Sequence, residues 1–166
     1  MAQTITITLY KSELLYAVEN DTHLLAQGIF NNDATAKASF GIQADSAAAK
    51  VKLLQSMQVG AQEVKNIISY FIQDTSNLSG NNTTLTMSNA NDAITLTLSV
   101  SDRFNTAFTE SLTMHCHNYI VNRMLRDWCL LSRKELAGDY QQLMAVAAQN
   151  IQSSFFKVAP TAPVHT

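Results

Sequence analysis

The feature that most constrains the fold of this chain is a change in the spacing of its apolar residues. In residues 3–9 and again in 83–100, apolar side chains alternate with threonine and other polar residues. That period of two is typical of half-buried β-strands. The polar sequence SNAND at 88–92 divides the second stretch into two arms. This arrangement predicts a β-hairpin, which strand 3–9 could extend to three strands.

Elsewhere the apolar residues recur every three or four positions, which predicts amphipathic helices. Ser132 and Glu135 have the spacing of a capping box, so one helix is expected to end there and the next to begin. Gly60 lies within a long helical stretch, where it either permits close packing against another helix or marks a bend. The four predicted helices cover residues 12–28, 46–75, 102–131 and 132–156, the third capped by Asp102.

The fold class that follows is mainly α with some β: a bundle of about four helices with a small antiparallel sheet made from the hairpin and the N-terminal strand. A chain of 166 residues can bury one hydrophobic core, and we expect a single domain over 1–157. Pro160 and Pro163 exclude a helix in residues 158–166, which are expected to form an extended C-terminal tail. The helical stripes place the following residues in the core: Val51, Leu54, Val64, Ile68, Leu112, Ile120, Trp128, Leu143 and Ile151.

Neutral polar residues replace charge in this chain. Charged residues make up 14% of it, against about 25% in typical soluble domains. Asn, Gln, Ser and Thr together supply 54 residues. Such a surface has few charges to desolvate when another subunit packs against it. The composition favours an assembly subunit, and the alternative is a monomer with a neutral coat.

Net charge and hydropathy narrow the classes of partner. A net charge of −2 is unlike that of a domain whose whole surface binds nucleic acid, although a small basic patch is compatible with it. No run of about 18 consecutive apolar residues is present, so no contact with a membrane is expected. The first ten residues do not resemble a signal peptide, and two cysteines are too few for a disulfide scaffold, so folding in the cytoplasm is expected.

No group of residues has the spacing of a known catalytic or metal-binding motif. His115, Cys116 and His117 belong to residue types that bind metals, but consecutive helical residues point about 100° apart and do not converge on one ion. Cys129 falls on nearly the opposite side of that helix from Cys116. We interpret Cys116 as a core cysteine between two interfacial histidines, and we expect neither a cofactor nor enzymatic activity.

Two further features concern contacts with partners. Arg123, Arg126 and Arg133 form a basic group that either complements the dipole at a helix C-terminus or faces an acidic partner or nucleic-acid backbone. The predicted strands are almost uncharged, since Asp92 is the only charged residue in 76–101. Natural sheet edges are usually protected by lysine, proline or bulges. Either the strands therefore protect one another, or an edge pairs with a neighbouring subunit.

The order of predicted elements resembles that of the head–tail connector (adaptor) proteins of tailed bacteriophages, of the type found in phages and prophages of gut Bacteroidetes. The opening TITITLYKSELLYAV (4–18) carries part of the resemblance, as does the hairpin running into DRFN (102–105). The stretch YIVNRMLRDWCLLSRKELAGDYQQLMAVAAQNIQSSFF (119–156) is similar to the family's closing pattern. In that pattern an aromatic-containing helix end and a short acidic-capped turn precede a helix with tyrosine and small residues that ends near an aromatic.

The resemblance implies a non-catalytic structural subunit of the virion, assembled in the host cytoplasm into a ring in the phage neck. Its expected partners are copies of itself, the portal and tail proteins, and DNA in passing. The arginine group is the expected acidic-partner or DNA-facing surface. The residues expected at protein interfaces lie in the hairpin and the tail: Leu85, Met87, Ile94, Leu96, Leu98, Val158, Pro160 and Pro163. The alternative is a small intracellular helical protein-binding module that acts as a monomer or dimer.

Overall fold

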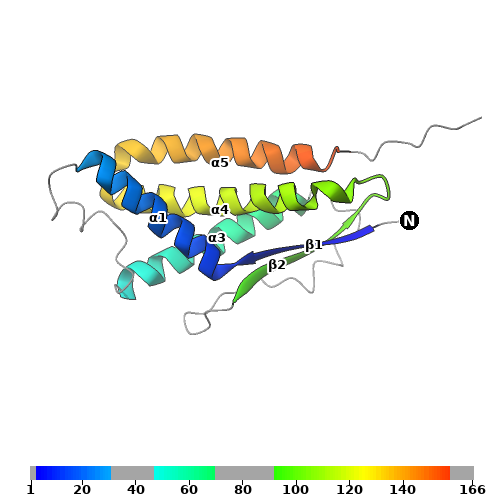
Figure 1. The fold of residues 1–166 in the computed structure, drawn as a ribbon, viewed down its shortest axis with the longest axis horizontal. Helices are drawn as coiled ribbons and strands as arrows, with labels where there is room; N and C mark the ends of the chain where they lie inside the picture. Colours follow the sequence, from blue (N-terminus) through cyan, green and yellow to red (C-terminus); the bar gives the residue numbers. More distant parts are fainter. Residues whose placement is uncertain (1–2, 31–46, 70–91, 158–166) are drawn as a thin grey trace, which may run out of the picture.

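The computed structural model describes residues 3–30, 47–69 and 92–157, and it confirms the predicted fold class (Figure 1). The described part of the chain is mostly helical, with a small antiparallel sheet. Its elements in chain order are β1 (Gln3–Tyr10), α1 (Lys11–Ile29), α3 (Ala47–Ser69), β2 (Ala93–Val100), the 3₁₀ helix η2 (Thr106–Phe108), α4 (Thr109–Ser132) and α5 (Lys134–Ser154).

Strands β1 and β2 pair antiparallel, with Gln3 opposite Val100 and Tyr10 opposite Ala93. Because side chains alternate between the faces of a sheet, the period of two in the sequence separates an apolar face from a hydroxyl face. The buried apolar pairs across the ladder are Ile5 with Leu98, Ile7 with Leu96, and Leu9 with Ile94. The hydroxyl-bearing pairs are Thr4 with Ser99, Thr6 with Thr97, and Thr8 with Thr95. The other arm of the predicted hairpin, with Leu85 and Met87, lies outside the described residues.

The helices form two layers around one core. Helices α4 and α5 run side by side along their whole length, α1 crosses them near one end, and α3 packs against α4 (Figure 1). At the other end of the α4–α5 pair, the backbone N–H of Asn105 donates a hydrogen bond of 3.1 Å to the carbonyl of Lys157. One hydrophobic cluster includes residues from both strands and from α1, α3, α4 and α5. The predicted core residues that are buried in it are Leu54, Val64, Ile68, Leu112, Ile120 and Ile151.

Three residues predicted for the core lie elsewhere. Val51 is 44% exposed, because α3 buries the face that carries Met57 and Ala61, and Val51 points roughly 110° away from the centre of that face. Leu143 is 49% exposed, because its neighbour Met144 takes the buried position on α5. Trp128 is only half-buried. In each case several apolar residues fit a helical stripe, and the packing partners select among them.

Two predicted helix caps are also wrong. The Asn105 side chain, rather than Asp102, accepts a hydrogen bond at the start of this helical region, from the backbone N–H of Ala107 at 3.1 Å. Ser132 does not form the capping box, because its hydroxyl donates to the carbonyl of Trp128 within α4. Arg133 instead occupies the position between α4 and α5, with no side-chain cap. Hydroxyl groups compete for nearby carbonyls, so a spacing that permits a cap does not enforce one.

Gly60 permits the close packing that was one of its two predicted roles. A Cβ atom at this position would lie 3.4 Å from Ile120 Cγ1 and 3.5 Å from Arg123 Cγ, both on α4. Any side chain larger than a methyl group would therefore meet α4 directly. The glycine sets the short separation between α3 and α4, and it places polar groups of the two helices within reach of one another.

Candidate functional site

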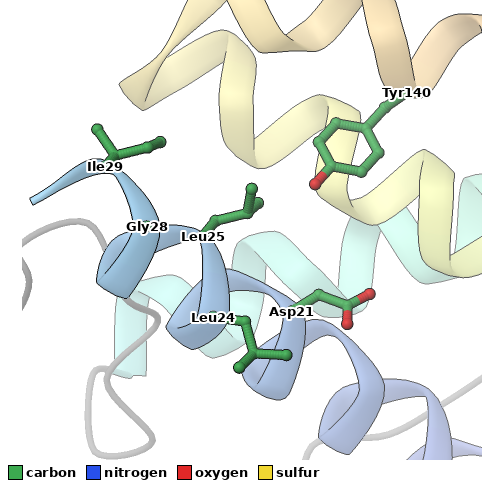
Figure 2. Close-up of a pocket in the computed structure, with 6 residues that line it drawn as sticks. All are labelled: Asp21, Leu24, Leu25, Gly28, Ile29 and Tyr140. Atoms are coloured by element: carbon green, nitrogen blue, oxygen red, sulfur yellow. The ribbon is translucent and has the colours of Figure 1, made fainter.

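An open groove lies between α1 and α5, and we call it the α1–α5 groove (Figure 2). It has a volume of about 400 Å³. Its lining is mostly aliphatic, with a single carboxylate and a single phenol: Asp21, Leu24, Leu25, Gly28, Ile29 and Tyr140. Leu24 is 56% exposed and Ile29 is 41% exposed. A concave surface of this composition suits an apolar partner that brings few polar groups.

Two titratable side chains line this groove, Tyr140 on α5 and Asp21 on α1. Tyr140 reaches from α5 toward α1, with its hydroxyl on the side of Asp21 and Leu25 (Figure 2). Burial raises the pKa of the Asp21 carboxyl above its ordinary value. Burial, followed by the nearby acidic groups, raises the pKa of Tyr140 to about 12, so its phenol stays protonated at neutral pH. The groove thus offers a hydroxyl that can donate and a carboxylate that can accept.

A second polar arrangement joins α3 to α4, and we call it the α3–α4 seam. Asp127 on α4 accepts hydrogen bonds from the Ser56 hydroxyl on α3 and from the guanidinium of Arg123. Arg126 also donates to Asp127, at 3.0 Å from its Nη2 atom, and it donates to Gln141 on α5 at 2.7 Å. The carboxylate of Asp127 therefore collects donors from two helices.

Glu63 extends the seam along α3. The hydroxyl of Tyr119 donates to Glu63 Oε2 at 3.1 Å, and Arg123 Nε lies 3.2 Å from the same oxygen. Arg123 Nε and Glu63 Oε2 are close enough to form an ion pair, but they do not have the geometry of a hydrogen bond. Arg123 Nε is therefore a buried nitrogen that lacks a hydrogen bond among the described residues. Burial and the adjacent Glu63 carboxylate raise the pKa of Tyr119 to about 12.

The pKa of Asp127 reflects the balance of these contacts. Burial acts to raise it, while the hydrogen bond from Ser56 and the charges of Arg123 and Arg126 act to lower it. The lowering effects together exceed the raising effect of burial, so the pKa of Asp127 lies below its ordinary value. The seam is a set of matched charges inside the subunit, formed by Glu63, Arg123, Arg126 and Asp127.

The predicted arginine group is divided by the fold. Arg123 and Arg126 belong to the seam, where their side chains are 12% and 23% exposed and Asp127 partly neutralises them. Arg133 lies past the end of α4, with its guanidinium 4.8 Å above the ring of Phe30 and 3.3 Å from Glu135. The three side chains therefore do not form one exposed basic surface on the described part of the subunit.

The predicted interface residues also fall in different places. Ile94, Leu96 and Leu98 are buried on the apolar face of the sheet, so these side chains belong to the subunit core and do not reach a partner. Period two predicts one buried face for a strand, and the helices of the same subunit already cover it. The remaining predicted residues lie outside the described ranges: Leu85, Met87, Val158, Pro160 and Pro163.

Cys116 is fully buried, which confirms the predicted core cysteine, and His115 and His117 on either side of it are half-buried. Burial raises the pKa of its thiol to about 12, which keeps it protonated and unreactive. His115 Nε2 lies 3.2 Å from the hydroxyl of Ser111 on the preceding turn. Within residues 3–30, 47–69 and 92–157, His, Cys, Asp and Glu side chains form no cluster that could hold a metal ion.

Comparison with protein-family models, curated proteins and solved structures found no match to this chain. None of the helices in the described ranges is long and apolar enough to cross a membrane. The groove residues were not predicted as a site, because leucine and isoleucine at helical spacing also fit a core.

Proposed function

We propose that this chain is a non-catalytic structural subunit that assembles with copies of itself into a ring, in the neck of a tailed bacteriophage. The neck location comes from the resemblance to head–tail connector proteins described above. There the ring would join the portal to the tail and pass DNA. The low content of charged residues supports self-assembly, and the outer edge of β1 supports it more strongly.

The observation that carries the assembly proposal is the outer edge of β1. Within the described residues, β1 has no backbone hydrogen bonds beyond its ladder with β2. Its eight residues include no charge, no proline and no glycine. Natural proteins protect such an edge unless another strand pairs with it, because its free N–H and C=O groups bind extended chains. A neighbouring subunit is the partner that a ring would supply.

The mass of the purified chain in solution, measured by light scattering over a range of concentrations, tests this proposal. We expect a discrete oligomer, or growth toward one, and ring-shaped particles in electron micrographs. Thr6→Lys places a charge on the exposed face of β1 and should shift the mass toward the monomer. Gln142→Lys adds the same charge on an exposed position of α5 and is the matched control. A monomer at every concentration would overturn self-assembly of the free subunit.

The second candidate function is a small helical protein-binding module that acts as a monomer or dimer. The α1–α5 groove favours it, because exposed leucine and isoleucine side chains around a concave surface are typical of peptide-binding sites. A monomeric chain that still binds a peptide in this groove would support the module in place of the ring.

A further inference from the structure

The α1–α5 groove has exposed apolar side chains that the described part of the subunit does not cover. Leu24 and Ile29 project from α1, and Tyr140 projects from α5 (Figure 2). Exposed aliphatic side chains and the half-buried Tyr140 ring border a cavity of about 400 Å³, which has room for a few residues of an extended peptide. The groove is too small for a helix, which is about 10 Å wide with its side chains.

The sequence contains a segment whose chemistry matches this groove. Residues 158–166 read VAPTAPVHT, and they carry no Asp, Glu, Lys or Arg. Pro160 and Pro163 are three residues apart, which is one turn of a polyproline II helix, so both rings would lie on the same side. Segments with this proline spacing bind aromatic-lined apolar grooves, because their restricted backbone loses little entropy on binding. Tyr140 supplies an aromatic ring to such a groove.

Residues 158–166 are too short to bring both prolines into the α1–α5 groove of the same copy. Tyr140 lies near the start of α5, and Ser154 at its other end is about 21 Å away at 1.5 Å per residue. Lys157 is held beside that far end, since its carbonyl accepts from Asn105 and its ammonium lies 5.8 Å from the centre of the Phe108 ring. From there Pro160 reaches about 9 Å and Pro163 about 19 Å at 3.1 Å per residue.

We propose that the α1–α5 groove of one copy binds residues 158–166 of a neighbouring copy. Pro160 and Pro163 pack against Leu24, Ile29 and Tyr140, and the Tyr140 hydroxyl donates to a carbonyl of the segment. The donor segment begins after Lys157 at one end of α5 and the acceptor groove lies at the other end, so each copy gives a segment to one neighbour and receives one from another. Such head-to-tail contacts close into rings when the rotation between copies permits it. The inference rests on the self-assembly proposed above and supplies one of its contacts.

The first test measures binding of a fluorescent peptide KVAPTAPVHT to the full chain carrying Pro160→Ala and Pro163→Ala, whose grooves are then free. We expect saturable binding, and we expect Leu24→Asp on this background to weaken it at least tenfold. Val59→Asp is the matched control, because Val59 is 43% exposed and belongs to α3, which contributes no residue to the lining of the groove. A peptide with both prolines replaced by alanine should also bind at least tenfold more weakly.

The second test mixes two full-chain variants and measures mass by light scattering. Leu24→Asp has a defective groove and an intact segment, and the double proline variant has the reverse. Each should lose mass alone, and the mixture should regain part of that mass, since the intact segment of one variant can occupy the intact groove of the other. Circular dichroism checks that both variants fold.

The outcomes separate the two proposals. If the unaltered chain assembles and both variants assemble equally well, the groove inference is wrong while the ring proposal stands. If the unaltered chain is a monomer and the peptide still binds in a way that Leu24→Asp abolishes, the contact between copies and the ring proposal both fail, and the groove is a peptide-binding site as in the second candidate function. Peptide binding that Leu24→Asp and Val59→Asp weaken equally would overturn the groove inference in either case.

Discussion

The α3–α4 seam and the α1–α5 groove are both contacts between helices, yet they differ in how completely the subunit fills them. In the seam, Gly60 brings the backbones together, Ile120 is fully buried, and Asp127 gathers the polar groups. In the groove, Leu24 remains more than half exposed and Tyr140 is only half-buried. The seam thus stabilises the subunit by itself, whereas the groove keeps apolar area that a partner can bury.

The largest effect is expected from Ile120→Ala, which opens a cavity in the seam. Ile120 has no exposed surface, and deletions of this size in a packed core destabilise proteins by about 2–5 kcal/mol. Leu24→Ala in the groove should change the free energy of unfolding by less than about 0.5 kcal/mol, as for other surface substitutions. Denaturant unfolding of the two variants measures both values. Equal losses of stability would mean that the groove is packed as tightly as the seam.

Gly60→Leu should rank second. The leucine side chain would extend past the Cβ position, which would already lie 3.4 Å from Ile120 Cγ1. Overpacking of this kind destabilises a protein by about 1–3 kcal/mol. Thermal unfolding followed by circular dichroism gives the change. An unaltered melting temperature would show that α3 can move away from α4 at little energetic cost, contrary to a closed seam.

Asp127→Asn should lower stability by about 1–3 kcal/mol at neutral pH, because it removes the charge that Arg123 and Arg126 face. The pKa of Asp127 is lowered in the folded state, so its contribution to stability is present above the ordinary carboxyl pKa near 3.8. That contribution is lost as the pH falls through the lower folded-state pKa. Unfolding measured from pH 7 to pH 2 should therefore show a gap between variant and parent that narrows below about pH 4. A gap of constant size would assign the effect to shape rather than charge.

The smallest expected effect is a gain in stability. An added Cβ at Gly138 on α5 would meet nothing within 4 Å, so Gly138→Ala should stabilise the helix by about 0.5–1 kcal/mol. Gly60→Ala has the same gain in helix propensity, but its methyl group must fit against α4 at 3.4 Å. Chemical denaturation of both variants compares them directly. A larger gain at Gly60 than at Gly138 would contradict the close approach as the reason for a glycine in the seam.

Much of the fold could be predicted from the sequence, because secondary structure leaves a periodic record along the chain. The alternation in residues 3–9 and 93–100 identified both described strands, and the helical stripes located the four described helices, although α4 begins at Thr109 and not at the predicted residue 102. Gly60 was also informative, since a glycine in a long helix has few explanations. These features depend on residues that are close together in the sequence, so they can be recognised in a single sequence without knowledge of the tertiary structure.

The candidate sites could not be predicted in the same way. Arg123, Arg126 and Asp127 were visible as charges, but Ser56 and Glu63, which complete their contacts, come from another helix. Leu24 and Leu25 are adjacent leucines, and nothing local indicates that both would border an open groove.

What the sequence determined by itself is the position of each described strand and helix to within several residues, and broadly which face of each is apolar. Only the tertiary structure decided which apolar residues are covered, such as Met144 rather than Leu143, and which charges find partners. The physical reason is that periodicity is set by the backbone geometry of one element, whereas burial depends on the elements that pack against it. Helix α5 illustrates both, because its stripe was readable but its orientation was set by α4.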